Sequence, residues 1–284
     1  MSINKSTKKR SNFIDYDYEN FYDEPIISLE KKKSIYVTKT IRAGDIFEVE
    51  IYPGFTKKEF DAFKPRTKPT RKAQMNLNNK NAQKRFIRLM NANFDFDDYI
   101  MHLTYSNDKL PGSIEEAEKE VYKLIRKINY RRKKDGLKNA KWMYVTEYDK
   151  DKKIRVHHHL IIEKGIDRKV MKDLWTNGKR TKVEELEPDE FGLTGLGKYL
   201  TKDPKGKKRW KSSKYLKQPI EKKSYSSFSN KKIWGMVDDD TKVSLYLNKR
   251  YRSKKYLNHQ IRYNSYNKMY YIYVQMRTKE RMNI

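Results

Sequence analysis

Three runs of apolar residues in the middle of the chain predict β-strands. Residues 99–105 and 142–148 form the first two runs, and a charged turn at 149–152 separates the second from a third at 154–163. The third run carries apolar residues at both odd and even positions, which is typical of a strand covered on both faces. We therefore expect the 154–163 strand to be central in a sheet.

Helical spacing appears in the segments around these strands. Ser113 and Glu116 form a capping box that opens a long helix, which runs to about Lys134 and ends at Gly136. Its apolar residues form one stripe, which indicates core packing. Shorter helices are predicted around Ala82–Met90, after Asp167, and over Gly195–Lys202 behind a Thr194 cap. This order of elements predicts an α+β fold with a central antiparallel sheet and flanking helices.

The segments on either side follow different patterns. Residues 1–33 show no clear period, residues 34–52 read as a hairpin, and Pro65 and Pro69 lie in a basic linker. Strand-like runs return after about residue 236, at 243–247 and 269–276. We therefore predict three regions: an N-terminal arm with hairpin and linker (1–75), a central domain (76–235) and C-terminal accessory strands (236–284).

The charge of the chain points to a polyanionic partner. Among 284 residues, 66 are Lys or Arg and 37 are Asp or Glu, which gives a net charge of +29, and nucleic acid is the default partner for such a surplus. No segment has the length of a membrane span or the amphipathic pattern of a membrane-binding helix. The absence of Cys excludes disulfides, thiolate zinc sites and cysteine nucleophiles. We expect an intracellular, cytoplasmic protein with no membrane partner.

Three of the five His residues lie together in the third predicted strand. Alternate side chains of a strand share a face, so His157 and His159 should point the same way, with backbones roughly 7 Å apart. Two imidazoles at that distance can bind one metal ion. The alternative is that these residues are polar side chains on a solvent-exposed strand face.

A third metal ligand is predicted at Glu147, on the preceding strand. Glu147 shares the face of the His pair only if an odd loop or a β-bulge sets the hairpin register, because a slip of one residue reverses the face. Asp149 and Asp151 are the alternatives. All three carboxylates could also belong to an ordinary charged hairpin.

Tyr199 and Lys202 lie three residues apart on one predicted helix face. A nearby cation and a metal-polarised phosphate would favour attack by the phenol oxygen, although such a pair arises easily by chance among 22 Tyr. The following segment, 205–217, is densely basic with interleaved aromatic residues, a pattern that suits phosphate contacts and base stacking but also a solvated loop. The predicted DNA-binding residues are Lys198, Lys205, Lys207, Lys208, Arg209, Trp210 and Lys211.

Taken in order, these motifs resemble those of the HUH endonucleases. A hydrophobic strand ending in Leu-Thr-Tyr at Tyr105 is followed by His157-x-His159 and then by Tyr199-x-x-Lys202. The resemblance covers about residues 76–234 and is closest to rolling-circle replication initiators of the phage and plasmid type. One departure is His158, since the residue between the paired His is usually hydrophobic in that family.

The resemblance implies a specific chemistry. His157, His159 and Glu147 would hold Mg²⁺ or Mn²⁺ against the scissile phosphate of single-stranded or hairpin origin DNA, and Tyr199 would attack it. The products would be a 5′-phosphotyrosine and a free 3′-OH that primes synthesis, with Lys202 steadying the phosphate. A host helicase and polymerase of a bacterial cell would be partners. With one Tyr in the motif, a second cleavage would require a second protomer or recycling of Tyr199.

Other functions remain open at the level of sequence. A relaxase or a single-tyrosine transposase would use the same chemistry. A non-catalytic DNA-binding regulator would keep the basic surface without cleavage. A metal hydrolase that uses only the His cluster would not need Tyr199.

Overall fold

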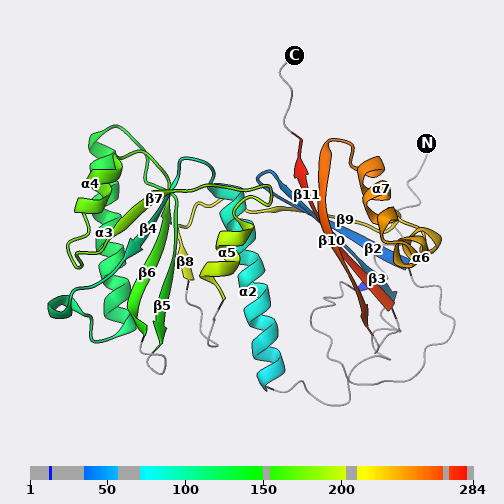
Figure 1. Ribbon diagram of the computed structural model, residues 1–284, viewed down its shortest axis with the longest axis horizontal. Helices are drawn as coiled ribbons and strands as arrows, with labels where there is room; N and C mark the ends of the chain where they lie inside the picture. The colour runs from blue at the N-terminus through cyan, green and yellow to red at the C-terminus, as the bar shows by residue number, and fades with distance from the viewer. Residues whose placement is uncertain are drawn as a thin grey trace. The chain divides into compact units, whose positions relative to one another are not determined.

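The computed structural model describes residues 13–14, 35–56, 71–149, 154–202, 210–264 and 269–279. The chain forms two compact units, one made of residues 81–218 and the other of residues 1–80 together with 219–284 (Figure 1). The predicted N-terminal arm and basic linker lie almost entirely outside the described residues. No helix in the described ranges has the length and apolar character needed to cross a bilayer.

The unit of residues 81–218 is built on a five-stranded antiparallel sheet with the strand order β7-β4-β6-β5-β8. Its strands are β4 (Tyr99–Leu103), β5 (Trp142–Asp149), β6 (Ile154–Ile162), β7 (Lys182–Glu185) and β8 (Trp210–Ser212). The predicted strands at 99–105, 142–148 and 154–163 correspond to β4, β5 and β6. As expected, β6 is the central strand. The two edge strands, β7 and β8, were not predicted.

Helices cover both faces of this sheet (Figure 1). The helices are α2 (Arg71–Asn93), α3 (Ile114–Lys134), α4 (Arg168–Asp173) and α5 (Thr194–Leu200), with a 3₁₀ turn η3 (Asn107–Lys109). One core cluster joins α3 and α4 to side chains such as Leu103 and Leu160. A second cluster joins α2 and α5 to the opposite face, through Phe86, Met143 and Ile161. The predicted α+β class is therefore confirmed.

The predicted capping of α3 is confirmed at both ends. The Ser113 hydroxyl accepts a hydrogen bond from the Glu116 backbone N–H, while the Glu116 carboxylate accepts one from the N–H of Gly112. At the other end Gly136 adopts a positive φ of 72°, which favours glycine. The expected stripe of apolar residues on α3 is buried, from Ala117 to Ile128.

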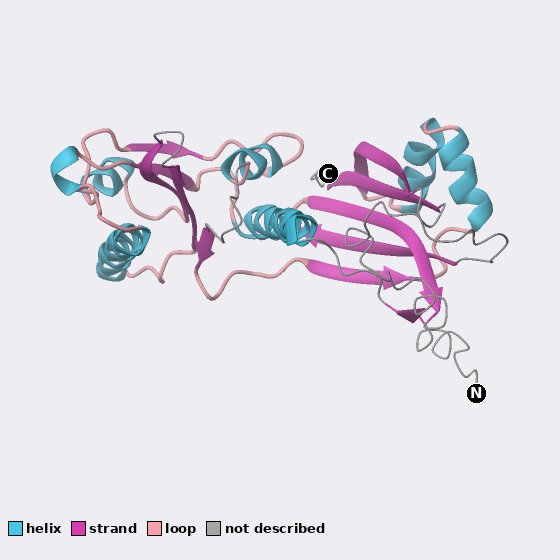
Figure 2. Ribbon diagram, turned by 90° about the horizontal axis from the view of Figure 1, so that it is seen from below, coloured by secondary structure: helices cyan, strands magenta, loops and turns pink. Residues whose placement is uncertain are grey.

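The other unit is a second antiparallel sheet, with the strand order β10-β11-β3-β2-β9 and β1 paired to β3 (Figure 2). Its elements are β1 (Phe13–Ile14), β2 (Ile35–Ala43), β3 (Ile46–Thr56), β9 (Ile220–Ser224), α6 (Asn230–Asp238), α7 (Thr241–Arg250), β10 (Lys254–Asn264) and β11 (Met269–Thr278). The predicted 34–52 hairpin is β2–β3. Strand β11 pairs directly with β3, so segments that the sequence analysis kept apart as N- and C-terminal extensions share one sheet.

The predicted strand at 243–247 is wrong, because these residues form part of α7. Val243 and Leu247 are buried while Leu245 between them is 62% exposed. This pattern matches the four-residue spacing of a helix, in which Val243 and Leu247 share one face. The Val-Ser-Leu-Tyr-Leu sequence also alternates in polarity, which is why it resembled a strand.

Candidate functional site

Glu147, His157 and His159 lie on one face of the sheet. Glu147 is directly opposite His157 in the ladder between β5 and β6, and directly opposite residues of an antiparallel pair share a face. The register shifts between Glu147 and Asp149, as the bulge hypothesis required. The structure thus brings together the three residues predicted as metal ligands, without Asp149, while Asp151 lies outside the described residues.

The geometry of this cluster suits a metal ion. One possible ligand atom from each side chain lies within 4.8 Å of the others. The Glu147 carboxylate lies 3.3 Å from Nε2 of His157 and 3.7 Å from Nε2 of His159. Nδ1 of His157 lies 3.0 Å from the Arg155 carbonyl, and a proton on Nδ1 leaves Nε2 as the ligand atom. Two imidazoles and a carboxylate could therefore hold a divalent ion, with ligand types that suit Mn²⁺ or Mg²⁺.

The protonation states of the cluster follow from its contacts. The hydrogen bond with His157 holds the pKa of Glu147 below its ordinary value, so the carboxylate is anionic at neutral pH. The same hydrogen bond raises the pKa of His157. Burial lowers the pKa of His159 to about 4, so this imidazole is neutral and keeps a lone pair. A metal ion would take the place of the proton shared by Glu147 and His157.

His158 points to the opposite side of the sheet, as the alternation of strand side chains predicts. It is fully buried on the side of α3 and α4. Its Nε2 lies 2.9 Å from the Tyr105 hydroxyl and its Nδ1 lies 2.9 Å from the Thr146 hydroxyl. Since the Tyr105 hydroxyl also donates to the Ala117 carbonyl, we assign the proton to Nε2, with Thr146 donating to Nδ1. His158 is therefore a core residue.

Helix α5 places Tyr199 and Lys202 beside the His and Glu cluster. The rings of Tyr199 and His159 meet edge to face, with their centroids 6.5 Å apart. The Lys202 ammonium lies 4.3 Å from the centroid of the Tyr199 ring. Tyr199 is 53% exposed, so its hydroxyl is accessible to a large substrate. The two residues of the Tyr-x-x-Lys motif are thus brought to the same face as the three candidate ligands.

The position of α5 is fixed by α2. Leu193 donates its backbone N–H to the Asn91 side chain at 2.7 Å, and the Gln83 amide donates to the Thr201 hydroxyl at 2.9 Å. A Cβ at Gly197 would lie 2.6 Å from Cγ1 of Ile87, so only glycine permits this close approach. The sequence analysis did not identify these contacts, because they join residues about a hundred positions apart.

A further imidazole adjoins the cluster. His102 on β4 lies directly opposite His159, with ring centroids 4.8 Å apart, and its Nε2 lies 3.2 Å from the Glu184 carboxylate. The sequence analysis gave His102 no role, because nothing in the sequence fixes which residue of β4 faces His159. His102 flanks His159 on the β4 side.

The predicted DNA-binding residues have different placements. Lys198 is exposed on α5, and Lys205, Lys207, Lys208 and Arg209 lie outside the described residues. Trp210 is buried against Phe86, so the stacking surface predicted there is not found. Lys211 forms an ion pair with Glu118, at 2.5 Å.

Comparison with known proteins gives one match. A family model described as that of the replication-associated protein ORF2 matches residues 98–204. This range contains β4, the three candidate ligands and α5, and it supports a role as a replication initiator. Neither curated proteins nor solved structures gave a match.

Proposed function

We propose that this chain is a rolling-circle replication initiator of the HUH type, which nicks origin DNA by metal-assisted transesterification. The observation that carries the proposal is the convergence of Glu147, His157 and His159 with Tyr199 and Lys202 on one sheet face. The family match over residues 98–204 and the net charge of +29 give independent support for a nucleic-acid substrate in replication.

In the proposed reaction, the hydroxyl oxygen of Tyr199 attacks the scissile phosphorus and loses its proton. The bond from phosphorus to the 3′ oxygen breaks, and that oxygen leaves as a 3′-OH after taking up a proton. A 5′-phosphotyrosine remains, and attack by a 3′-OH reverses the step and rejoins the strand. A divalent ion held by Glu147, His157 and His159 would neutralise charge on the phosphate oxygens.

Lys202 and His159 position the nucleophile in this proposal. The Lys202 ammonium next to the Tyr199 ring would stabilise negative charge that develops on the phenol oxygen and on the phosphate. The edge-to-face contact with His159 restricts the Tyr199 ring. Because Tyr199 stands on a short helix that α2 anchors, its hydroxyl can be held near the phosphate without a mobile loop.

The decisive experiment is a search for a covalent protein–DNA adduct on a denaturing gel. A pool of single-stranded oligonucleotides is incubated with Mn²⁺ and with wild type, Tyr199→Phe or Tyr215→Phe. Tyr215 is 61% exposed in the same unit, so its variant controls for loss of a surface phenol. We expect an adduct with wild type and Tyr215→Phe only. No wild-type adduct on a pool that is demonstrably bound would refute the proposal.

The same samples separate the alternatives. A non-catalytic regulator predicts binding with no cleavage by any variant, and a metal hydrolase predicts that Tyr199→Phe still cuts DNA. A relaxase or transposase would form the same adduct, so these need a second test. Primer extension from the released 3′-OH by a host polymerase and helicase is expected only for a replication initiator.

A further inference from the structure

The outward face of α3 carries a dense row of cations on the side of the sheet away from the candidate metal site. We define the α3 cation face as Lys119, Lys123, Arg126, Lys127, Arg131, Lys133 and Lys134, all of which are exposed. No acidic residue occurs between Val121 and Lys134. Helix α3 packs in the core cluster on the His158 side of the sheet, whereas α2 and α5 pack on the other side. The α3 cation face was not among the predicted DNA-binding residues.

These charges are largely unneutralised by the protein itself. Lys123 pairs with Glu120 at 2.5 Å. Across the described parts of the chain, no ion pair is found for Lys119, Arg126 or Lys127. Cations in the last turn complement the helix dipole, but this reason does not extend to residues two or more turns before the end of the helix. Most of the row thus lacks a reason within the fold.

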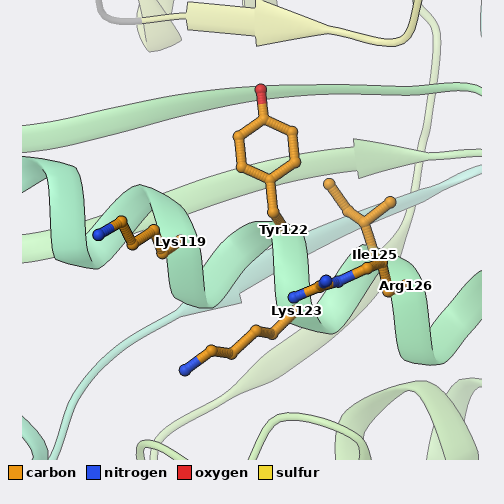
Figure 3. A pocket seen from close by; sticks show the side chains of 5 residues that line it. All are labelled: Lys119, Tyr122, Lys123, Ile125 and Arg126. Carbon is orange, nitrogen blue, oxygen red and sulfur yellow. The ribbon is translucent and has the colours of Figure 1, made fainter.

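A hollow of about 420 Å³ lies within this face. Its lining consists of Lys119, Tyr122, Lys123, Ile125 and Arg126, and Figure 3 shows these side chains extending from one helix. Three cations around one concave surface could contact a phosphate group from several directions. The hollow therefore offers one well-defined contact within the longer row.

The aromatic residues on this side favour backbone contact over base stacking. The Tyr122 ring meets Trp142 and Tyr144 edge to face and also has Lys211 5.8 Å from its centroid. The Tyr130 ring has the Lys134 ammonium 4.8 Å from its centroid. Lysines thus compete with bases for both rings, whereas stacking platforms for single strands present open aromatic faces.

We propose that the α3 cation face binds the phosphate backbone of duplex DNA. From Lys119 to Lys134 the helix rises about 22 Å, and a duplex presents about 13 phosphate charges over that length, at one per 1.7 Å. A straight, rigid row of cations matches this density better than it matches a flexible single strand. The face would hold the duplex that adjoins the single-stranded segment at the candidate active site.

The test compares two variants with equal charge loss. The first is Lys119→Gln, Arg126→Gln, Lys127→Gln on α3, and the second is a control, which changes three exposed lysines in the other unit. The control substitutions are Lys231→Gln, Lys232→Gln and Lys249→Gln. Binding to a blunt duplex longer than two helical turns, and to a single strand of equal length, is measured across a range of salt concentrations.

We expect the α3 variant to reduce the salt slope of duplex binding by up to about 3, because each phosphate contact contributes about 0.9 to it. The control should reduce the slope by less than about 1, and single-strand slopes should change little for either variant. An unchanged duplex slope, an equal change in the control, or a change confined to single strands would overturn the proposal. Melting temperatures of both variants check that each is folded.

This inference can be separated from the proposed nicking activity. The α3 variant should still form the Tyr199 adduct on a short single-stranded oligonucleotide, since its substitutions lie on the opposite side of the sheet. Loss of that adduct would show that the α3 cation face serves the active-site strand, and would overturn the proposal. If wild type formed no adduct at all, the nicking proposal would fail while the duplex measurement would still decide this one.

Discussion

His158 should make the stability of the protein depend on pH. Burial lowers its pKa to about 3, because a charged imidazole would lose its hydration among core side chains. In the unfolded chain the same group has a pKa of about 6.5. Between these two values the unfolded state binds a proton that the folded state excludes, so stability falls as the pH falls below about 6.5.

The size of this effect follows from the two pKa values. At about pH 5 the unfolded imidazole lies 1.5 pH units below its pKa, and each unit corresponds to about 1.4 kcal/mol, so the loss is about 2 kcal/mol. For a cooperative unit of 150–250 residues this corresponds to a fall in Tm of about 4–8 °C. The effect is large compared with a total stability of about 5–15 kcal/mol.

The variant His158→Gln isolates this contribution. Its amide can still bond to the hydroxyls of Tyr105 and Thr146 but does not titrate, and all other ionisable groups are the same in both proteins. Urea unfolding at about pH 7.5 and pH 5 should show a loss that is about 2 kcal/mol smaller for the variant than for wild type. Equal losses in the two proteins would refute the assignment of a neutral, buried His158.

Three further predictions concern the candidate site. Gly197→Ala should force α5 from α2, since its Cβ would lie 2.6 Å from Ile87; we expect about 1–3 kcal/mol of destabilisation and less adduct. Gly195→Ala is the matched control, because its nearest neighbour is 3.9 Å away, and equal losses would contradict the reasoning. Glu147→Gln should weaken Mn²⁺ binding at least about tenfold in calorimetry, because an anionic ligand is lost; unchanged affinity would exclude Glu147 as a ligand. Lys202→Met should slow single-turnover adduct formation about a hundredfold, and an unchanged rate would exclude electrostatic assistance.

The sequence predicted those parts of the structure that depend on local patterns. The capping box of α3 depends on Ser113 and Glu116, only three positions apart, and the strand pattern of 154–163 depends on consecutive apolar residues. The faces of His157, His158 and His159 follow from alternation alone. Each of these features is decided by neighbours in the chain, so a single sequence contains all the information required.

Features that depend on distant contacts could not be predicted in this way. The side of the sheet that Glu147 faces rests on a bulge in the β5–β6 ladder, and the sequence only stated the condition for it. The edge strand β8 begins at Trp210, whose burial against Phe86 depends on a helix more than a hundred residues earlier. A basic segment with aromatic residues therefore resembled an exposed DNA-binding loop, although its Trp belongs to the core.

The register of β6 is determined by polar groups as well as by apolar residues. A slip of one residue would turn His157 and His159 toward α3 and bring His158 to the Glu147 side. On the α3 side the hydroxyls of Tyr105 and Thr146 can satisfy one imidazole, and a second buried imidazole without partners would cost about 1–3 kcal/mol. The apolar pattern alone separates the two registers weakly, because β6 is hydrophobic on both faces. The hydrogen bonds of His158 therefore help to keep His157 and His159 on the face where Tyr199 lies.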